Sequence, residues 1–262
     1  MTGLRELAAE FLGTSLLLFF GLSAVVVNLS ADAPMESLIP AEGARKLLAS
    51  VLFAAAATLI IYSPIGRISG GHINPAVTLT FAGLGKMTPQ RAIYYLVSQF
   101  FGAILGTVAV ALAWGRRATE VHMGATLPGR GGIVLALTAE VAATLVMLCV
   151  IMTFTKRPRL ASFTPAAAGV VIAAIGFFTS PFYGASMNPA RSFGPALVGS
   201  IWTALWVYML APSLGALAAV YVNRYRILPC GKMIHDPRYT CRFRNCLYTR
   251  LSESTAGEDR MR

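Results

Sequence analysis

Apolar positions are not spread evenly along the chain but gather in six long runs that are separated by shorter polar segments. Each run is about 20 residues long, which is the length that a helix needs to cross ~30 Å of hydrocarbon. The pattern therefore predicts an all-α membrane protein with six transmembrane helices. These helices are expected over Leu7–Leu29, Leu47–Ile65, Ala92–Trp114, Ile133–Phe154, Phe163–Thr179 and Ile201–Tyr221.

Two further apolar segments, Gly70–Gly83 and Gly184–Val198, are too short to cross a bilayer. A segment of this kind must bury its backbone polar groups in protein or line a water-filled cavity. Asparagine is a favourable helix N-cap, and proline is favoured at the first helical position. Each segment is therefore predicted to start a re-entrant half-helix at its Asn-Pro-Ala motif. The motifs are Asn74-Pro75-Ala76 and Asn188-Pro189-Ala190.

The two halves of the chain repeat the same order of motifs. An Ala-Glu pair lies early in the first and fourth runs, at Glu10 and Glu140, and an Asn-Pro-Ala motif follows the second and fifth runs. An odd number of spans in each copy forces the copies into opposite orientations, which gives an inverted repeat. We expect a channel domain over 1–223, with repeats at about 1–115 and 132–223, and a basic tail over 224–262, for which disorder is one interpretation.

Inverted symmetry brings the two half-helices in from opposite sides of the membrane, so their positive N-terminal ends should meet near the midplane. The side-chain amides of Asn74 and Asn188 could then both donate to the oxygen of a passing solute. Two positive helix ends repel cations and disfavour proton passage. A single Asn-Pro-Ala is usually no more than a helix start, but two copies at matching positions favour a pore.

Composition agrees with a membrane location. The 262 residues are 56% hydrophobic and only 13% charged, whereas soluble domains carry about 25% charged residues. The formal charge of +11 does not indicate nucleic-acid binding, because the basic residues are scattered between the apolar spans. Lys and Arg in the short loops place both termini in the cytoplasm. The short chain without a transit peptide suggests a bacterial inner membrane.

The motifs together resemble those of the aquaporins, or major intrinsic proteins, over about residues 1–223. The resemblance implies six tilted helices with two half-helices, one pore in each subunit, a homotetramer and no cofactor. It also implies that Glu10, Glu140 and His72 anchor the re-entrant loops. The matching stretches are Ala9–Thr14, Ser69–Thr78, Ser98–Gly102 and Asn188–Pro195.

The family pattern also implies a selectivity filter of four residues. Arg191, directly after the second motif, matches the filter arginine, and counting along the pattern gives Ala54, Gly176 and Ala185 for the other three. Three small residues would leave a filter wider than that of a water-selective channel. The inference depends on register, because one residue turns a helix by 100° and would bring Phe53 or Phe177 into the filter.

Two features bear on the branch of the family. Ser192 follows the filter arginine where dedicated glycerol facilitators carry Asp, and the stretch Trp206–Pro212 resembles the nodulin-like (NIP) branch. This resemblance implies passage of water with glycerol, urea or neutral hydroxides such as arsenous, boric or silicic acid. The alternatives are a water-selective aquaporin, a coupled secondary transporter and a closed structural protein. An enzyme is not expected, because no nucleophile, base and orienting group converge.

The basic tail contains three cysteines and a histidine spaced as C-x4-H-x5-C-x4-C. Four such ligands can make a zinc site of the Cys₃His type, although the usual C-x2-C pair is missing. A reduced tail without metal is the other interpretation. The candidate ligands are Cys230, His235, Cys241 and Cys246.

Overall fold

Long apolar helices make up most of the structure, which is a computed structural model that describes residues 3–225 and 230–234. Within these residues, six helices are long and apolar enough to cross a membrane, which confirms the predicted spans. Several helices extend a few residues beyond the apolar run, because polar side chains continue the helix; Lys46 and Glu42, for example, form an i,i+4 ion pair at 2.6 Å. The six are α1 (Leu4–Leu29), α2 (Glu42–Tyr62), α5 (Pro89–Trp114), α7 (Gly132–Thr155), α9 (Thr164–Tyr183) and α11 (Leu205–Asn223).

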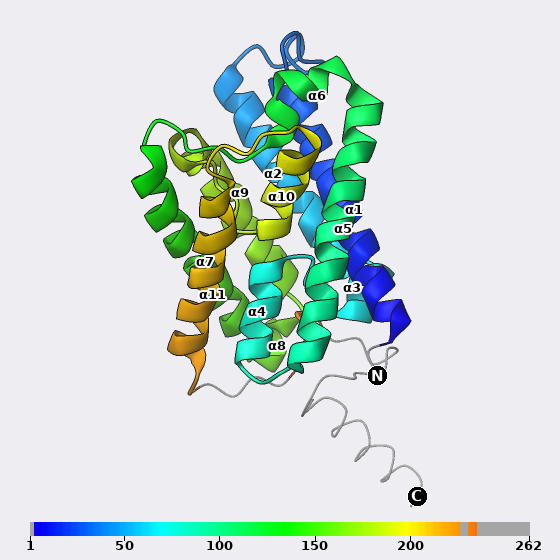
Figure 1. Cartoon of the computed structure of the whole chain (residues 1–262), viewed down its shortest axis with the longest axis vertical. Helices are drawn as coiled ribbons and strands as arrows, with labels where there is room; N and C mark the ends of the chain where they lie inside the picture. Colours follow the sequence, from blue (N-terminus) through cyan, green and yellow to red (C-terminus); the bar gives the residue numbers. More distant parts are fainter. Residues whose placement is uncertain (1–2, 226–229, 235–262) are drawn as a thin grey trace, which may run out of the picture.

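Shorter helices lie between the spans. The half-helices α4 (Pro75–Gly83) and α10 (Pro189–Val198) both begin at the proline of an Asn-Pro-Ala motif. Figure 1 shows them in opposite halves of the bundle, with α4 near the end where the N-terminus lies and α10 near the other end. We call these ends the terminal face and the opposite face. The remaining short helices are α3 (Pro64–Ser69), α6 (Arg116–Glu120), η1 (His122–Gly124) and α8 (Pro158–Ala161).

The half-helix of each repeat packs on the last long helix of the other repeat. A Cβ added at Gly83 of α4 would lie 2.7 Å from Val220 of α11, and one at Gly194 of α10 would lie 2.6 Å from the carbonyl oxygen of Ala103 of α5. Neither position has room for a larger side chain. The two copies are therefore interlocked, as an inverted repeat with an aquaporin-like fold requires.

Matching glycines also let the first and last long helices of each repeat approach closely. A Cβ at Gly102 of α5 would lie 2.4 Å from the carbonyl oxygen of Phe11 of α1, and one at Gly215 of α11 would lie 2.8 Å from that of Val141 of α7. Small residues commonly allow such backbone approach between membrane helices. Gln99 and Gly102 in the first repeat have the same spacing as Pro212 and Gly215 in the second, so the two pairs occupy matching positions and both glycines make this packing contact.

Candidate functional site

The two asparagines cap the half-helices that follow them. Asn74 Oδ1 accepts a hydrogen bond from Ala76 N at 2.8 Å, and Asn188 Oδ1 accepts one from Arg191 N at 3.2 Å. Both residues have extended backbone dihedrals, which are typical of an N-cap. The two capped ends lie together in the middle of the bundle and direct the positive ends of α4 and α10 toward each other.

The asparagine amides also cross from one re-entrant loop to the other. Asn74 Nδ2 donates to the carbonyl oxygen of Met187 at 2.9 Å, and Asn188 Nδ2 donates to that of Ile73 at 3.1 Å. Each amide nitrogen carries two hydrogens. One fastens the loops to each other, and the second can serve a solute oxygen that passes between the asparagines.

Buried Glu10 holds the first re-entrant loop. Its carboxylate accepts from His72 N at 3.0 Å, from Ile73 N at 2.7 Å and from Gln99 Nε2 at 2.7 Å. A carboxylate at membrane depth is costly unless it is fully engaged. These three donors engage it, and they fix the loop backbone one residue before Asn74.

Buried Glu140 makes the equivalent contacts in the second repeat. Its carboxylate accepts from Ser186 N and from Met187 N, the latter at 2.9 Å. The position that matches Gln99 is Pro212, which has no side-chain donor. The second anchor therefore rests on two backbone donors, whereas the first also has a side-chain donor.

The backbone just before each asparagine adopts positive φ angles that L-residues with a side chain rarely take. Ile73 has φ of 42°, Ala185 of 51° and Met187 of 53°. Such conformations cost about 1–3 kcal/mol each and persist only where the surroundings impose them. The two carboxylates supply that constraint, because they bind the amides of Ile73 and Met187 directly.

His72 links the first loop to its half-helix and to a distant part of the chain. Its Nδ1 lies 3.1 Å from Thr78 Oγ1, and its Nε2 lies 2.8 Å from the carbonyl oxygen of Gly231. The ring stacks on Phe81 with centroids 4.9 Å apart and is buried. His72 thus contacts both the re-entrant loop and the segment after α11.

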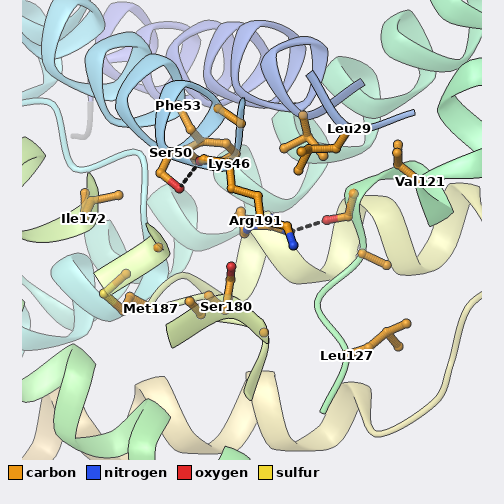
Figure 2. A pocket seen from close by; sticks show the side chains of 18 residues that line it. Leu29, Lys46, Ser50, Phe53, Val121, Leu127, Ile172, Ser180, Met187 and Arg191 are labelled. Atoms are coloured by element: carbon orange, nitrogen blue, oxygen red, sulfur yellow. Dashed lines mark hydrogen bonds between the residues drawn. The ribbon is translucent and has the colours of Figure 1, made fainter. Parts of the chain in front are cut away.

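A cavity of about 360 Å³ lies on the side of the opposite face, with Arg191 and Met187 of the second re-entrant segment in its wall (Figure 2). It is bounded by α2 on one side and by α9 and the second re-entrant loop on the other. Arg191, Gly176 and Ala185 all belong to its wall, so the structure brings three of the four predicted filter residues together. Other side chains in the wall include Lys46, Ser50, Phe53, Ile172 and Ser180.

The fourth position differs from the expectation. Phe53, not Ala54, lines the cavity, and Ala54 is only 4% exposed on the side of α2 that packs toward Gly169 of α9. The family pattern predicts Ala54 for the filter, whereas the cavity wall holds its neighbour Phe53, and one residue turns the side chain by about 100° around α2.

The Phe53 ring and the Arg191 guanidinium lie against each other. Arg191 Cζ is 5.3 Å from the ring centroid, within the range of a cation–π contact, and Nη1 donates to the carbonyl oxygen of Gly124 at 2.6 Å. Gly21 of α1 makes room for the ring, because a Cβ there would lie 2.6 Å from Phe53 Cδ2. The ring and the guanidinium are therefore fixed from two sides.

Gly176 and Ala185 contribute little bulk to the wall. A Cβ at Gly176 would meet Ser50 Oγ at 3.4 Å, so this position has space for at least a methyl group. The wall of the cavity around Arg191 thus includes one aromatic ring, one cation and two positions with little or no side chain.

Ser192 lies behind the filter in a group of buried hydroxyls. Its Oγ accepts from Thr126 Oγ1 at 2.7 Å and also contacts Ser186 Oγ. This contact ties the segment before α7 to the second re-entrant loop. Ser192 is only 1% exposed, so its hydroxyl acts on the loop rather than on a solute.

Sequence reasoning missed the role of the segment that leads into α7. Gly124 supplies the carbonyl that holds Arg191, and Val121, Ala125 and Leu127 line the cavity. No motif marks this segment, and only its glycines hint at an irregular backbone. Ser50 and Ser180 were also missed, since single serines in apolar helices usually bond to their own helix.

Of the candidate zinc ligands, only Cys230 falls among the described residues, where it is buried. His235, Cys241 and Cys246 lie outside them. The described residues contain no group of three or more His, Cys, Asp or Glu side chains that could hold a metal ion. The zinc site therefore stays a prediction from the tail sequence.

The sequence is similar to those of known aquaporins. The chain is 40% identical to aquaporin NIP1-4 of Oryza sativa over 221 residues, which cover 84% of this chain and 76% of the relative. It is 36% identical to the probable aquaporin AqpM of Archaeoglobus fulgidus over 244 residues, with coverage of 86% and 98%. The first relative is named as a NIP aquaporin, which agrees with the predicted resemblance to the NIP branch.

The fold also matches a solved structure. The X-ray structure of the aquaglyceroporin from Plasmodium falciparum superposes with a TM-score of 0.72 at 20% identity, and the match covers 86% of this chain and 97% of that one. Residues 1–223 match the Major intrinsic protein family. Together with the inverted repeat and the paired asparagine motifs, this match shows that the chain belongs to the major intrinsic protein family of membrane channels and is not an enzyme.

Proposed function

We propose that this channel passes uncharged solutes of the size of glycerol as well as water, and that its filter consists of Phe53, Gly176, Ala185 and Arg191. The observation that carries the proposal is that these four residues share the wall of one cavity. An aromatic ring and a guanidinium lie 5.3 Å apart there, and the two other positions are a glycine and an alanine.

This arrangement suits a solute that has a carbon side and a hydroxyl side. The guanidinium can donate to hydroxyl oxygens, while the Phe53 ring offers an apolar surface to the carbon atoms. Past the filter, the amides of Asn74 and Asn188 supply the next donors. Arg191 and the two helix ends together repel cations.

The same wall bears on the choice of solute. Phe53 makes the filter narrower than Ala54 would, so large solutes are excluded, but Gly176 and Ala185 still leave more room than water needs. Glycerol and urea fit this description, and so do neutral hydroxides such as boric, silicic and arsenous acid. A relative in structure is named an aquaglyceroporin, which supports the wider pore over a water-selective one.

Stopped-flow light scattering on proteoliposomes tests the proposal, with water and glycerol gradients run on the same preparations. Gly176→His should lower glycerol permeability by at least about tenfold, the scale on which an ill-fitting group is rejected, and should leave water permeability within about twofold. Gly176→Ala is the matched control, since a methyl group fits beside Ser50. Water flux without glycerol flux in the unchanged protein would identify a water-selective channel instead.

We also propose that the terminal face is cytoplasmic and that the protein assembles as a homotetramer. Basic residues at that face include Arg5, Arg67, Lys86 and Arg91, of which Arg91 pairs with Glu6 at 2.8 Å. At the opposite face, Lys46 pairs with Glu42 and Arg45 with Glu36. Positive residues in short loops favour the cytoplasmic side.

A further inference from the structure

The segment 230–234, beyond the last spanning helix, lies inside the bundle. Cys230 is 1% exposed, Lys232 2%, Met233 2% and Ile234 6%. Its three apolar side chains belong to the same buried cluster as Ile73 and Val77 of the first re-entrant segment. In Figure 1 the segment appears in orange within the lower half of the molecule, toward the terminal face.

Three polar contacts fix the segment on the first re-entrant loop. Met233 N donates to the carbonyl oxygen of Gly70 at 3.1 Å, and the carbonyl oxygen of Gly231 contacts His72 Nε2 at 2.8 Å. Lys232 Nζ donates to the carbonyl oxygen of Arg67, in α3, at 3.1 Å. The contacts involve backbone and side chains on both partners, so they define one docked position.

Gly70 permits a particularly close approach. A Cβ at this residue would lie 2.9 Å from Lys232 Cγ and 3.0 Å from Lys232 Cα, and its φ of 97° already disfavours other residues. The segment therefore lies directly against the loop backbone with no side chain between them.

The position of this loop shows what the segment covers. Ile73 O accepts the amide of Asn188 at the centre of the protein, and the chain from Ile73 back to Gly70 leads from there to α3 at the terminal face. A solute that has passed the asparagines must leave along this stretch. Residues 231–233 bind to Gly70 and to His72, that is, to its outer part.

We propose that residues 230–234 are a built-in plug that closes the pore at the terminal face, and that solute flux requires their release. The proposal rests on the channel function stated above. The plug is held by a few hydrogen bonds and by the burial of three small or medium apolar side chains. Docking is therefore an equilibrium that lowers flux without abolishing it, and loss of one contact shifts it measurably.

The first test removes one donor from the full-length protein. Met233→Pro has no backbone N–H to offer to Gly70, and it should raise both water and glycerol permeability of proteoliposomes roughly fivefold, the effect of one net hydrogen bond. Met233→Leu keeps the N–H and nearly the same volume, so its permeability should equal that of the unchanged protein. The double variant Lys232→Ala/Met233→Pro removes a second contact and should conduct faster still.

Maleimide labelling reports the position of the segment independently of flux. Cys230 should react slowly in the unchanged protein and in Met233→Leu, and at least about fivefold faster in the opened variants, with the labelled site located by mass spectrometry. Faster labelling together with faster flux supports the plug. Rapid labelling of Cys230 in the unchanged protein overturns it, as does faster labelling without any gain in flux.

The remaining outcomes separate this proposal from the one on solutes. If the opened variants gain water flux but no glycerol flux, the plug stands and the proposed solute range fails. If the unchanged protein already passes glycerol as fast as the double variant, the solute range stands and the plug fails. Continued protection of Cys230 in the double variant, with flux unchanged, also rules the plug out, because the contacts that define it would then not hold the segment.

Discussion

At the scale of single residues, the filter depends on how Phe53 is held. The ring lies between Gly21 of α1, which leaves it space, and Arg191, whose guanidinium is 5.3 Å from its centroid. Both neighbours act on the same ring, one by making room behind it and the other by facing it across the pore. The width of the filter should therefore respond to changes on either side of Phe53.

Substitutions at and behind the ring should change selectivity in opposite directions. Phe53→Ala removes the ring and should let a four-carbon polyol such as erythritol pass about tenfold faster, because a widened pocket rejects extra carbon only weakly. Gly21→Ala places a Cβ 2.6 Å from Phe53 Cδ2, pushes the ring into the pore and should slow glycerol. Proteoliposome swelling rates for water, glycerol and erythritol measure both effects.

Ala54→Ser is the control, since Ala54 is buried away from the cavity. The permeabilities of Ala54→Ser to water, glycerol and erythritol should stay within about twofold of those of the unchanged protein, because the substitution does not alter the cavity wall. If Ala54→Ser changes the selectivity and Phe53→Ala does not, Ala54 is the filter residue of α2, as the sequence predicts.

At the scale of elements, the two re-entrant segments are held by carboxylates that are not equivalent. Glu10 accepts from two backbone amides and from Gln99, whereas Glu140 accepts from two backbone amides alone. Both hold backbone with positive φ in place just before an asparagine. The first re-entrant loop thus has one more donor in its anchor than the second.

Removal of these carboxylates should destabilise the protein by different amounts. Each buried donor that loses its acceptor costs about 1–3 kcal/mol, so both Glu10→Ala and Glu140→Ala should lower the unfolding temperature, and Glu10→Ala should lower it more. The temperature is read from tryptophan fluorescence of the detergent-solubilised protein. Glu10→Gln and Glu140→Gln keep one acceptor oxygen and should fall between. An equal or larger loss in Glu140→Ala would contradict the assigned difference.

At the scale of the whole molecule, the two ends of the bundle carry different structures. The filter cavity lies toward the opposite face, and the docked segment 230–234 lies toward the terminal face. The interlocked half-helices join the ends at the two asparagines. In the proposed channel, the solute is selected near the opposite face, and the pore is closed near the terminal face.

The proposed orientation can be tested with single cysteines on the two faces. Gln90, at the start of α5, and Thr203, before α11, are both exposed and lie at the terminal and opposite faces respectively. In intact bacterial cells, a membrane-impermeant maleimide should label Thr203→Cys but should label Gln90→Cys only after permeabilisation. Mass spectrometry distinguishes these sites from the native cysteines. The reverse pattern would invert the assigned orientation.

Much of the fold could be predicted from local pattern, because each feature concerned depends on few neighbours. A run of apolar residues long enough for the bilayer becomes a helix whatever packs beside it, and Asn74-Pro75 and Asn188-Pro189 cap a helix through their own side chains and rings. Gly176, Ala185 and Arg191, which the family pattern predicts for the filter, share the wall of one cavity. These three positions, like the spans and the caps, were readable without coordinates.

The rest depended on contacts between distant parts of the chain. The cavity wall holds Phe53 and not Ala54, because the side of α2 that faces the cavity is set by how α2 packs against its neighbours. The carbonyl of Gly124 at Arg191, the amide of Gln99 at Glu10 and the docking of Gly231 on His72 join residues that are far apart in sequence.

The sequence by itself determined the six spans, the inverted repeat and the two capped half-helices, since hydrophobic length and local capping act over a few residues. Only the tertiary structure decided which face of α2 lines the cavity and that residues 230–234 dock on the first re-entrant loop. Both depend on how helices and loops are placed against one another, and that placement is set by packing that no single segment encodes.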